Sequence, residues 1–119
     1  MENAKSNVLS SAVRAATTNS ADQTNYDCRG VHLIVDVTVV PGVDTVTPKI
    51  QGMANGIYYD ILVGSAISAT GTTVLKVYPG IAASANVSAS DALPLQWRVV
   101  MTHSAATDFT YSVTANLIT

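Results

Sequence analysis

The pattern of hydrophobic and polar positions is clearest in Arg29–Val40, which reads RGVHLIVDVTVV. Its odd positions from 31 to 39 are all aliphatic and mostly β-branched, whereas its even positions mix polar and apolar residues. Because side chains alternate between the two faces of a strand, the odd set forms one continuous apolar face. Pro41 and Gly42 then end the strand, since proline cannot donate to the ladder and glycine accepts turn dihedrals. The pattern predicts the central strand of a small β domain.

Five further segments alternate in the same way between turn-forming residues, and we predict strands at 45–53, 57–63, 72–78, 95–103 and 109–117. Residues 45–63 and 95–117 are predicted to form two hairpins. Pro48 predicts that its strand lies at a sheet edge or carries a bulge. The last strand has an apolar set that should face inward: Phe109, Tyr111, Val113, Ala115 and Leu117. The prediction is an all-β fold, an antiparallel, jelly-roll-like β-sandwich of about six to eight strands.

The first 28 residues differ from the rest, because they are rich in Ser, Thr, Asn and Ala. Leu9, Val13 and Ala16 are spaced by four and three residues, which predicts at most a short helix. Two interpretations stay open for this segment: a disordered terminus, or an extended N-terminal arm that orders against a neighbouring subunit. We therefore divide the chain into an arm, 1–28, and a β-sandwich domain, 29–119.

Composition narrows the class of protein. Of the 119 residues, 48% are hydrophobic and only 12% are charged, with a net charge of −2. So few charges predict a surface that is largely covered by partners, and scattered basic residues predict no binding to nucleic acid or to an anionic membrane. A single cysteine, Cys28, excludes a disulfide framework. The absence of a signal sequence and of a membrane-spanning run predicts assembly in the cytoplasm.

Candidate chemistry is sparse. His32 and Asp36 share one strand face but lie roughly 13 Å apart, too far for a base and its orienting acid. His103, Ser104 and Asp108 meet near a turn without any pattern that would hold them as a triad. We predict no catalytic, cofactor-binding or metal-binding residues, and no enzyme activity. Trp97 is predicted to belong to the core, with ligand stacking as the alternative.

Residues 20–38, SADQTNYDCRGVHLIVDVT, resemble the start of a group of small structural proteins of tailed bacteriophages. Five later segments resemble the same group: 46–52, 58–62, 66–71, 93–99 and 109–115. The similarity extends over nearly the whole chain, although the relatives carry a β-branched residue at position 48 and usually no cysteine at position 28. The resemblance implies a virion protein on the head, a capsid decoration or cement protein, in the form of a homotrimer without a cofactor.

The partners implied are the major capsid protein and further copies of this chain, on the capsid surface of the virion. We expect the arm to lie along these partners, and expect Tyr58 and Tyr59 to point to opposite sheet faces, one into the core and the other into an interface. The interface residues predicted are Val8, Leu9, Val13, Arg14, Tyr58 and Tyr59. Two alternatives stay open. A tail or head–tail connector protein would usually show a long hairpin, which the sequence does not make evident, and a virion-surface carbohydrate-binding module would need a row of exposed aromatic residues.

Overall fold

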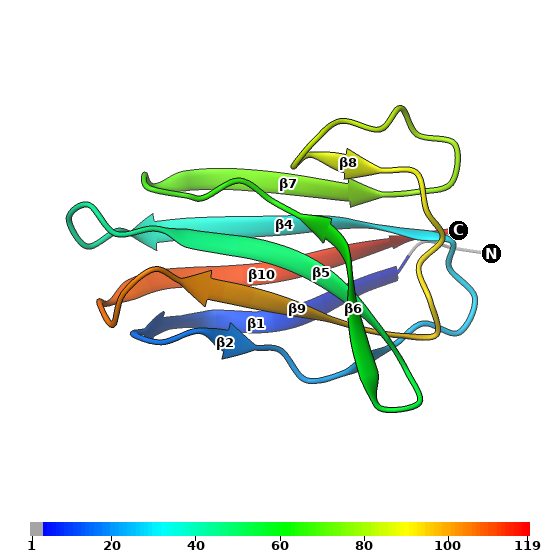
Figure 1. Ribbon diagram of the computed structural model, residues 1–119, viewed down its shortest axis with the longest axis horizontal. Coiled ribbons are helices and arrows are strands. Elements are labelled where there is room, and N and C mark those ends of the chain that lie inside the picture. Colours follow the sequence, from blue (N-terminus) through cyan, green and yellow to red (C-terminus); the bar gives the residue numbers. More distant parts are fainter. Residues whose placement is uncertain (1–3) are drawn as a thin grey trace.

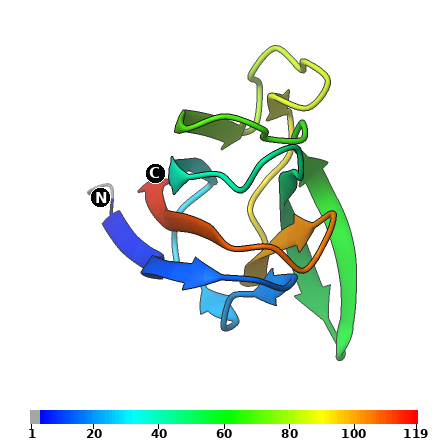
Figure 2. The same cartoon turned by 90° about the vertical axis from the view of Figure 1, so that its left-hand side faces the viewer.

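The computed structural model describes residues 4–119, which fold into two β-sheets packed face to face (Figure 1). Sheet A has the strand order β1-β10-β4-β7-β8, and sheet B the order β2-β9-β5-β6, with β3 also paired to β9. The strands are β1 (Ala4–Arg14), β2 (Thr18–Asn19), β3 (Gln23–Thr24), β4 (Gly30–Val39), β5 (Val46–Ala54), β6 (Ile57–Val63), β7 (Gly71–Val77), β8 (Ser88–Ala89), β9 (Gln96–His103) and β10 (Phe109–Ile118). Viewed from one end, the strands form two layers (Figure 2). The predicted all-β sandwich is confirmed, while the jelly-roll connectivity stays a prediction.

Strand β4 occupies the middle of sheet A, between β10 and β7, as its pattern predicts. Its odd residues from Val31 to Val37 are at most 1% exposed and line the core. Val39 is the exception at 51% exposure, because it lies at the end of the strand. The apolar face of β4 is therefore one wall of the interior.

The facing wall comes from sheet B, chiefly from β9 and β5. Trp97, Val99 and Met101 are fully buried, and so is Ile50 of β5. On β10 the inward set from Phe109 to Ala115 is also fully buried, in agreement with its alternating pattern. Side chains of this size dominate the burial of apolar surface, at about 25 cal/mol per Å². Trp97 is thus a core residue, and its ring cannot stack on a ligand at the surface.

The prediction that residues 95–117 form a hairpin is wrong. β9 belongs to sheet B and β10 to sheet A, so the two strands face each other across the core instead of pairing side by side. The connection 104–108 carries the chain from one sheet to the other. An alternating strand must bury its apolar face, but the pattern does not say whether the next strand in sequence is its ladder partner or its partner across the core.

The prediction that Pro48 marks a sheet edge is also wrong, because β5 lies between β9 and β6. The register shift in this hairpin falls between Ile50 and Gln51, not at the proline. The amide of Gly64 donates to the carbonyl oxygen of Pro48 at 2.8 Å, where the chain has just left β6. A missing N–H is tolerated in an interior strand at this point because the neighbouring ladder has ended.

Residues 4–14 form strand β1 and not a short helix. β1 pairs with β10 from Ala4↔Leu117 to Arg14↔Phe109, and register shifts interrupt the ladder on both sides of Leu9. The strand is extended because its backbone pairs with β10, and its one buried side chain, Val8, is 8% exposed and belongs to the core. Residues 4–24 thus contact both sheets through β1, β2 and β3. The division of the chain at residue 28 and the role of an arm stay predictions.

Candidate functional site

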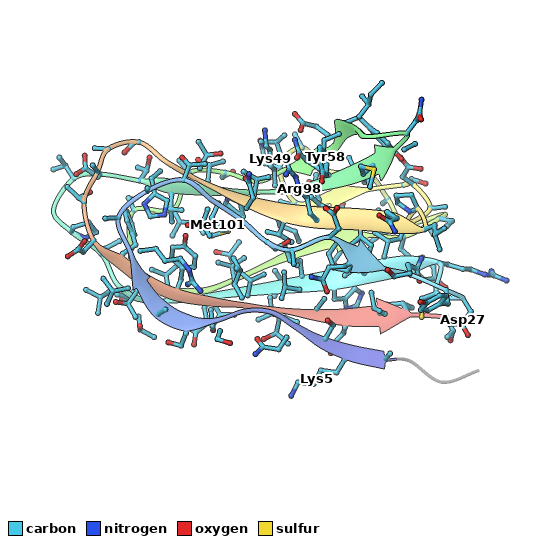
Figure 3. The ribbon with its side chains drawn as sticks, turned by 90° about the horizontal axis from the view of Figure 1, so that it is seen from below. Lys5, Asp27, Lys49, Tyr58, Arg98 and Met101 are labelled. Carbon is cyan, nitrogen blue, oxygen red and sulfur yellow. The ribbon has the colours of Figure 1, made fainter. Side chains whose placement is uncertain are left out.

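The outer face of sheet B carries a connected set of polar side chains from β5, β6 and β9. Its centre is Arg98, whose guanidinium carbon lies 3.5 Å from the centroid of the Tyr58 ring. Figure 3 shows Lys49, Tyr58 and Arg98 gathered at this side of the molecule. A guanidinium so close to an aromatic face is attracted by the negative charge density of the ring. We call this set, with Asp22, Gln51 and Asp60, the polar network.

Gln51 joins Arg98 to the acidic end of the polar network. Arg98 Nε donates to Gln51 Oε1 at 2.9 Å, and Gln51 Nε2 donates to Asp60 Oδ1 at 2.8 Å. Lys49 Nζ lies 3.5 Å from the same carboxylate oxygen. The hydrogen bond from Gln51 is the largest effect on the pKa of Asp60 and lowers it; burial opposes this change, and the charge and hydrogen bond of Lys49 add to the lowering. Gln51 itself is only 8% exposed, so both polar ends of its amide are used inside the network.

Tyr58 anchors the other end of the polar network to the segment between β2 and β3. Its hydroxyl donates to the two carboxylate oxygens of Asp22 at 2.8 and 3.0 Å. This hydrogen bond, followed by desolvation and the negative charge of Asp22, raises the pKa of Tyr58, because each favours the protonated phenol. Each charged group of the network therefore has a partner within the chain. These contacts hold the side chains of the network in one arrangement on the outer face of sheet B.

A second exposed feature is the inner face of the β5–β6 hairpin. The turn of this hairpin extends beyond the other strands (Figures 1 and 2). Gly52 and Tyr59 are ladder partners there, and a Cβ on Gly52 would lie 2.5 Å from Tyr59 Cζ and 2.9 Å from Pro94 Cγ. Ile57, two residues earlier on the same face, is 68% exposed, and Tyr59 is 46% exposed. We call Gly52, Ile57, Tyr59 and Pro94 the hairpin ledge. It is the part of the core-facing side of the hairpin that extends beyond the buried core.

The six predicted interface residues fall into two separate groups. Val8, Leu9, Val13 and Arg14 lie on β1 at one edge of sheet A, whereas the two tyrosines lie on β6 at the opposite edge of sheet B. Val8 is buried and Leu9 packs against the core, so these side chains support the fold. Val13 is 63% exposed. Arg14 is engaged with β10, since its Nη1 donates to the carbonyl oxygen of Tyr111 at 2.7 Å.

The expectation that one of the two adjacent tyrosines enters the core is wrong. They do point to opposite faces of β6, but Tyr58 is half-buried under Arg98 in the polar network, and Tyr59 covers Gly52 on the hairpin ledge. Neither ring reaches the interior because this end of the hairpin extends past the sandwich. Whether either tyrosine belongs to an interface stays a prediction.

His103 and Ser104 do not form a catalytic pair. The hydroxyl of Ser104 accepts a hydrogen bond from the amide of Thr45 at 2.8 Å. His103 Nε2 lies 2.9 Å from the hydroxyl of Tyr111, and its ring stacks edge-on against Phe109. The Nδ1 atom is buried without a hydrogen-bond partner among the described residues. Burial lowers the pKa of His103, a backbone contact at Thr107 opposes the change, and the charge of Arg14 lowers it further.

Residues 4–119 contain no detectable pocket and no group of three side chains that could hold a metal ion. In the same range there is no helix long and apolar enough to cross a membrane.

No protein-family model matches the chain, and no curated protein or solved structure matches it.

The polar network was not predicted from the sequence. Gln51 and Arg98 face each other because β5 pairs with β9, and these two residues are 47 positions apart. The alternation of Lys49, Gln51 and Arg98 with core residues does assign all three to the outer face of their strands. That signal gives the face of each strand but not which strands are adjacent, so it could not assemble the network.

Proposed function

We propose that this protein is a capsid decoration protein of a tailed bacteriophage, which binds the outside of the head lattice and stabilises it without catalysis. The proposal rests on the resemblance of residues 20–38 and of five later segments to small phage structural proteins. The β-sandwich is compatible with it, because a cement protein needs a rigid body that contacts several neighbours. The partners are the major capsid protein and further copies of this chain.

The observation that best supports an adhesive role is the hairpin ledge. Ile57 and Tyr59 continue the core-facing side of sheet B into solvent, next to Pro94. An apolar sheet face that extends beyond its own core gains free energy when another surface covers it, at about 25 cal/mol per Å². On a chain with only 12% charged residues, little repulsion or desolvation of charge opposes such contact.

A lattice amplifies weak contacts of this kind. When subunits are linked to each other or bound at neighbouring sites, the second contact becomes intramolecular and the overall affinity rises by about 10²–10⁴ without any new interaction. One exposed apolar ledge per subunit is therefore enough for stable decoration if the subunits form a trimer at a capsomer junction. The trimer itself is part of the proposal.

The decisive experiment is an image reconstruction of the virion, in which the copy number and symmetry position of the chain are determined. Hundreds of copies on the shell would support the proposal, whereas a few copies at one vertex or in the tail would refute it. A binding assay with heads that lack the protein then tests the hairpin ledge. Ile57→Ser should weaken binding by about tenfold, since covering an aliphatic side chain contributes about 1.5 kcal/mol. Val43→Ser, at a loop residue that is 92% exposed, is the matched control and should bind like the wild type.

One observation favours a second candidate. The projecting β5–β6 hairpin is the kind of element through which tail-tube or head–tail connector subunits stack in rings. Under that function the hairpin turn, 55–56, would contact the next ring rather than the capsid. The same reconstruction separates the two functions, because a connector is present in a ring of few copies.

A further inference from the structure

Strand β1 is attached to the sandwich mainly through its backbone. Of its eleven residues only Val8 is buried, while Leu9 is half-buried against the core. β1 pairs with β10 along the ladder, and the Ser6 hydroxyl also donates to Gln23 Oε1 on β3 at 3.3 Å. Because a second copy supplies the same Val8 and Leu9, the interior is the same whichever copy provides β1.

The C-terminal end of β1 is fastened by Arg14. Its guanidinium donates to the carbonyl oxygen of Tyr111 on β10 and lies 4.8 Å from the centre of the Tyr111 ring. It also donates to the carbonyl oxygens of Ser10 and Ala12 in its own strand, where the register of the ladder breaks. The hydrogen bonds of Arg14 are thus made within β1 or with β10, and β1 from a second copy would make the same bonds.

The link between β1 and the rest of the chain is short. β1 ends at Arg14 in sheet A and β2 begins at Thr18 in sheet B, so only residues 15–17 cross from one sheet to the other. This crossing lies at the end of the molecule that faces the viewer in Figure 2. A short link that must turn between two sheets favours an extended form, in which the strand continues onto a neighbouring molecule.

We propose that β1 is exchanged between copies of this chain, so that β1 of one copy pairs with β10 of another. The partner is a second copy, because β1 of this chain already fits β10 through the ladder, the buried Val8 and the bonds of Arg14. Exchange replaces each β1–β10 contact by an identical one and requires a change of conformation only in the link at 15–17. The proposal does not depend on the phage function, since it concerns how the subunits assemble with each other.

Exchange of β1 gives an oligomer of limited size rather than a fibre. The free edge of β1 is interrupted by the register shifts around Leu9, and the guanidinium of Arg14 occupies carbonyl oxygens of its own strand. Interrupted edges of this kind resist the addition of further strands. Copies therefore pair through β10 and do not extend into fibres through β1.

A disulfide trap distinguishes exchange from the closed monomer. Lys5 and Asn116 are direct partners in the β1–β10 ladder and both are exposed; Lys5 is labelled on β1 in Figure 3. In a Cys28→Ser background, the pair Lys5→Cys and Asn116→Cys is oxidised after refolding at high protein concentration. Directly opposed strand residues are close enough for a disulfide. Exchange predicts that the covalent dimer, or a larger covalent oligomer, is the main band on a non-reducing gel.

The matched control is the pair Asp36→Cys and Thr72→Cys, which are opposed and exposed across β4 and β7. In this control variant the disulfide should form within one chain at every protein concentration. Strand exchange is refuted if the disulfide between positions 5 and 116 also forms only within one chain. It is refuted equally if the wild type has the mass of a monomer by light scattering. Mixing the two single-cysteine variants gives a second measurement: a crosslinked heterodimer supports exchange, and its absence after refolding together contradicts it.

Discussion

Replacing Arg14 by alanine should loosen β1 without unfolding the sandwich. The substitution removes the bond from Nη1 to the carbonyl oxygen of Tyr111, at 2.7 Å, and the contact of the guanidinium with the Tyr111 ring. It also frees the carbonyl oxygens of Ser10 and Ala12, which then turn to water. β1 keeps its ladder with β10 and the buried Val8, so it is weakened but not lost.

The magnitude follows from these contacts. A hydrogen bond from a charged donor contributes about 1.5 kcal/mol at the low end of its range, which is appropriate because Arg14 is only half-buried. The contact with the ring adds about 0.5 kcal/mol at a partly exposed site. The bonds to Ser10 and Ala12 are exposed to water and add little. The free energy that holds β1 closed should fall by about 2 kcal/mol, which corresponds to a roughly 30-fold larger population of the opened strand.

Hydrogen exchange measured by mass spectrometry is the appropriate assay, because it resolves local opening from global unfolding. Peptides that cover residues 4–14 should exchange about 30-fold faster in Arg14→Ala, while peptides from β5 and β9 keep their rates. Arg29→Ala is the matched control, because the Arg29 side chain is exposed and makes no hydrogen bond or ion pair with the described residues. Equal protection of β1 in the two variants, or a uniform loss across both sheets, would show that Arg14 does not fasten this strand.

Three further outcomes are expected. Because burial lowers the pKa of His103 below 6.5, the unfolded chain takes up the proton first, and stability should fall as the pH drops below 7, by at most about 1.4 kcal/mol per pH unit; urea unfolding at pH 5 and 7 should show this slope, and His103→Gln should flatten it. Gly30→Ala should destabilise the protein by about 2 kcal/mol, since the new Cβ would lie 2.3 Å from the backbone oxygen of Val77; an unchanged urea midpoint would refute that packing. Asp22→Asn should lower the raised pKa of Tyr58 toward 10, which an ultraviolet absorbance titration measures against the wild type.

Much of the fold could be predicted from the alternation of side chains. The apolar face of β4, the inward set on β10 and the burial of Trp97 all follow from period-two patterns, because each strand must turn one face to the core. What the pattern could not supply is the neighbour of each strand. The connection 104–108 could form a hairpin or could lead to the opposite sheet, because the apolar faces of β9 and β10 are buried in both arrangements. The structure has the second arrangement.

The N-terminal segment and the polar network were harder to predict for the same reason. β1 has one buried residue and many small polar ones, so its strand conformation comes from the ladder that β10 offers rather than from its own sequence. Tertiary context overrides weak local propensity in such segments. The polar network likewise needs β5 beside β9, a pairing between residues 47 positions apart for Gln51 and Arg98.

The pairing of Ala4 with Leu117 brings the two ends of the folded chain side by side. A short linker could therefore join the ends into a continuous hairpin, and new ends could be opened in the exposed loop 82–87. Such a circular permutant would have fewer conformations available to its unfolded chain around β1. It would also connect β1 covalently to β10 of the same chain. This connection would favour the subunit in which β1 is not exchanged.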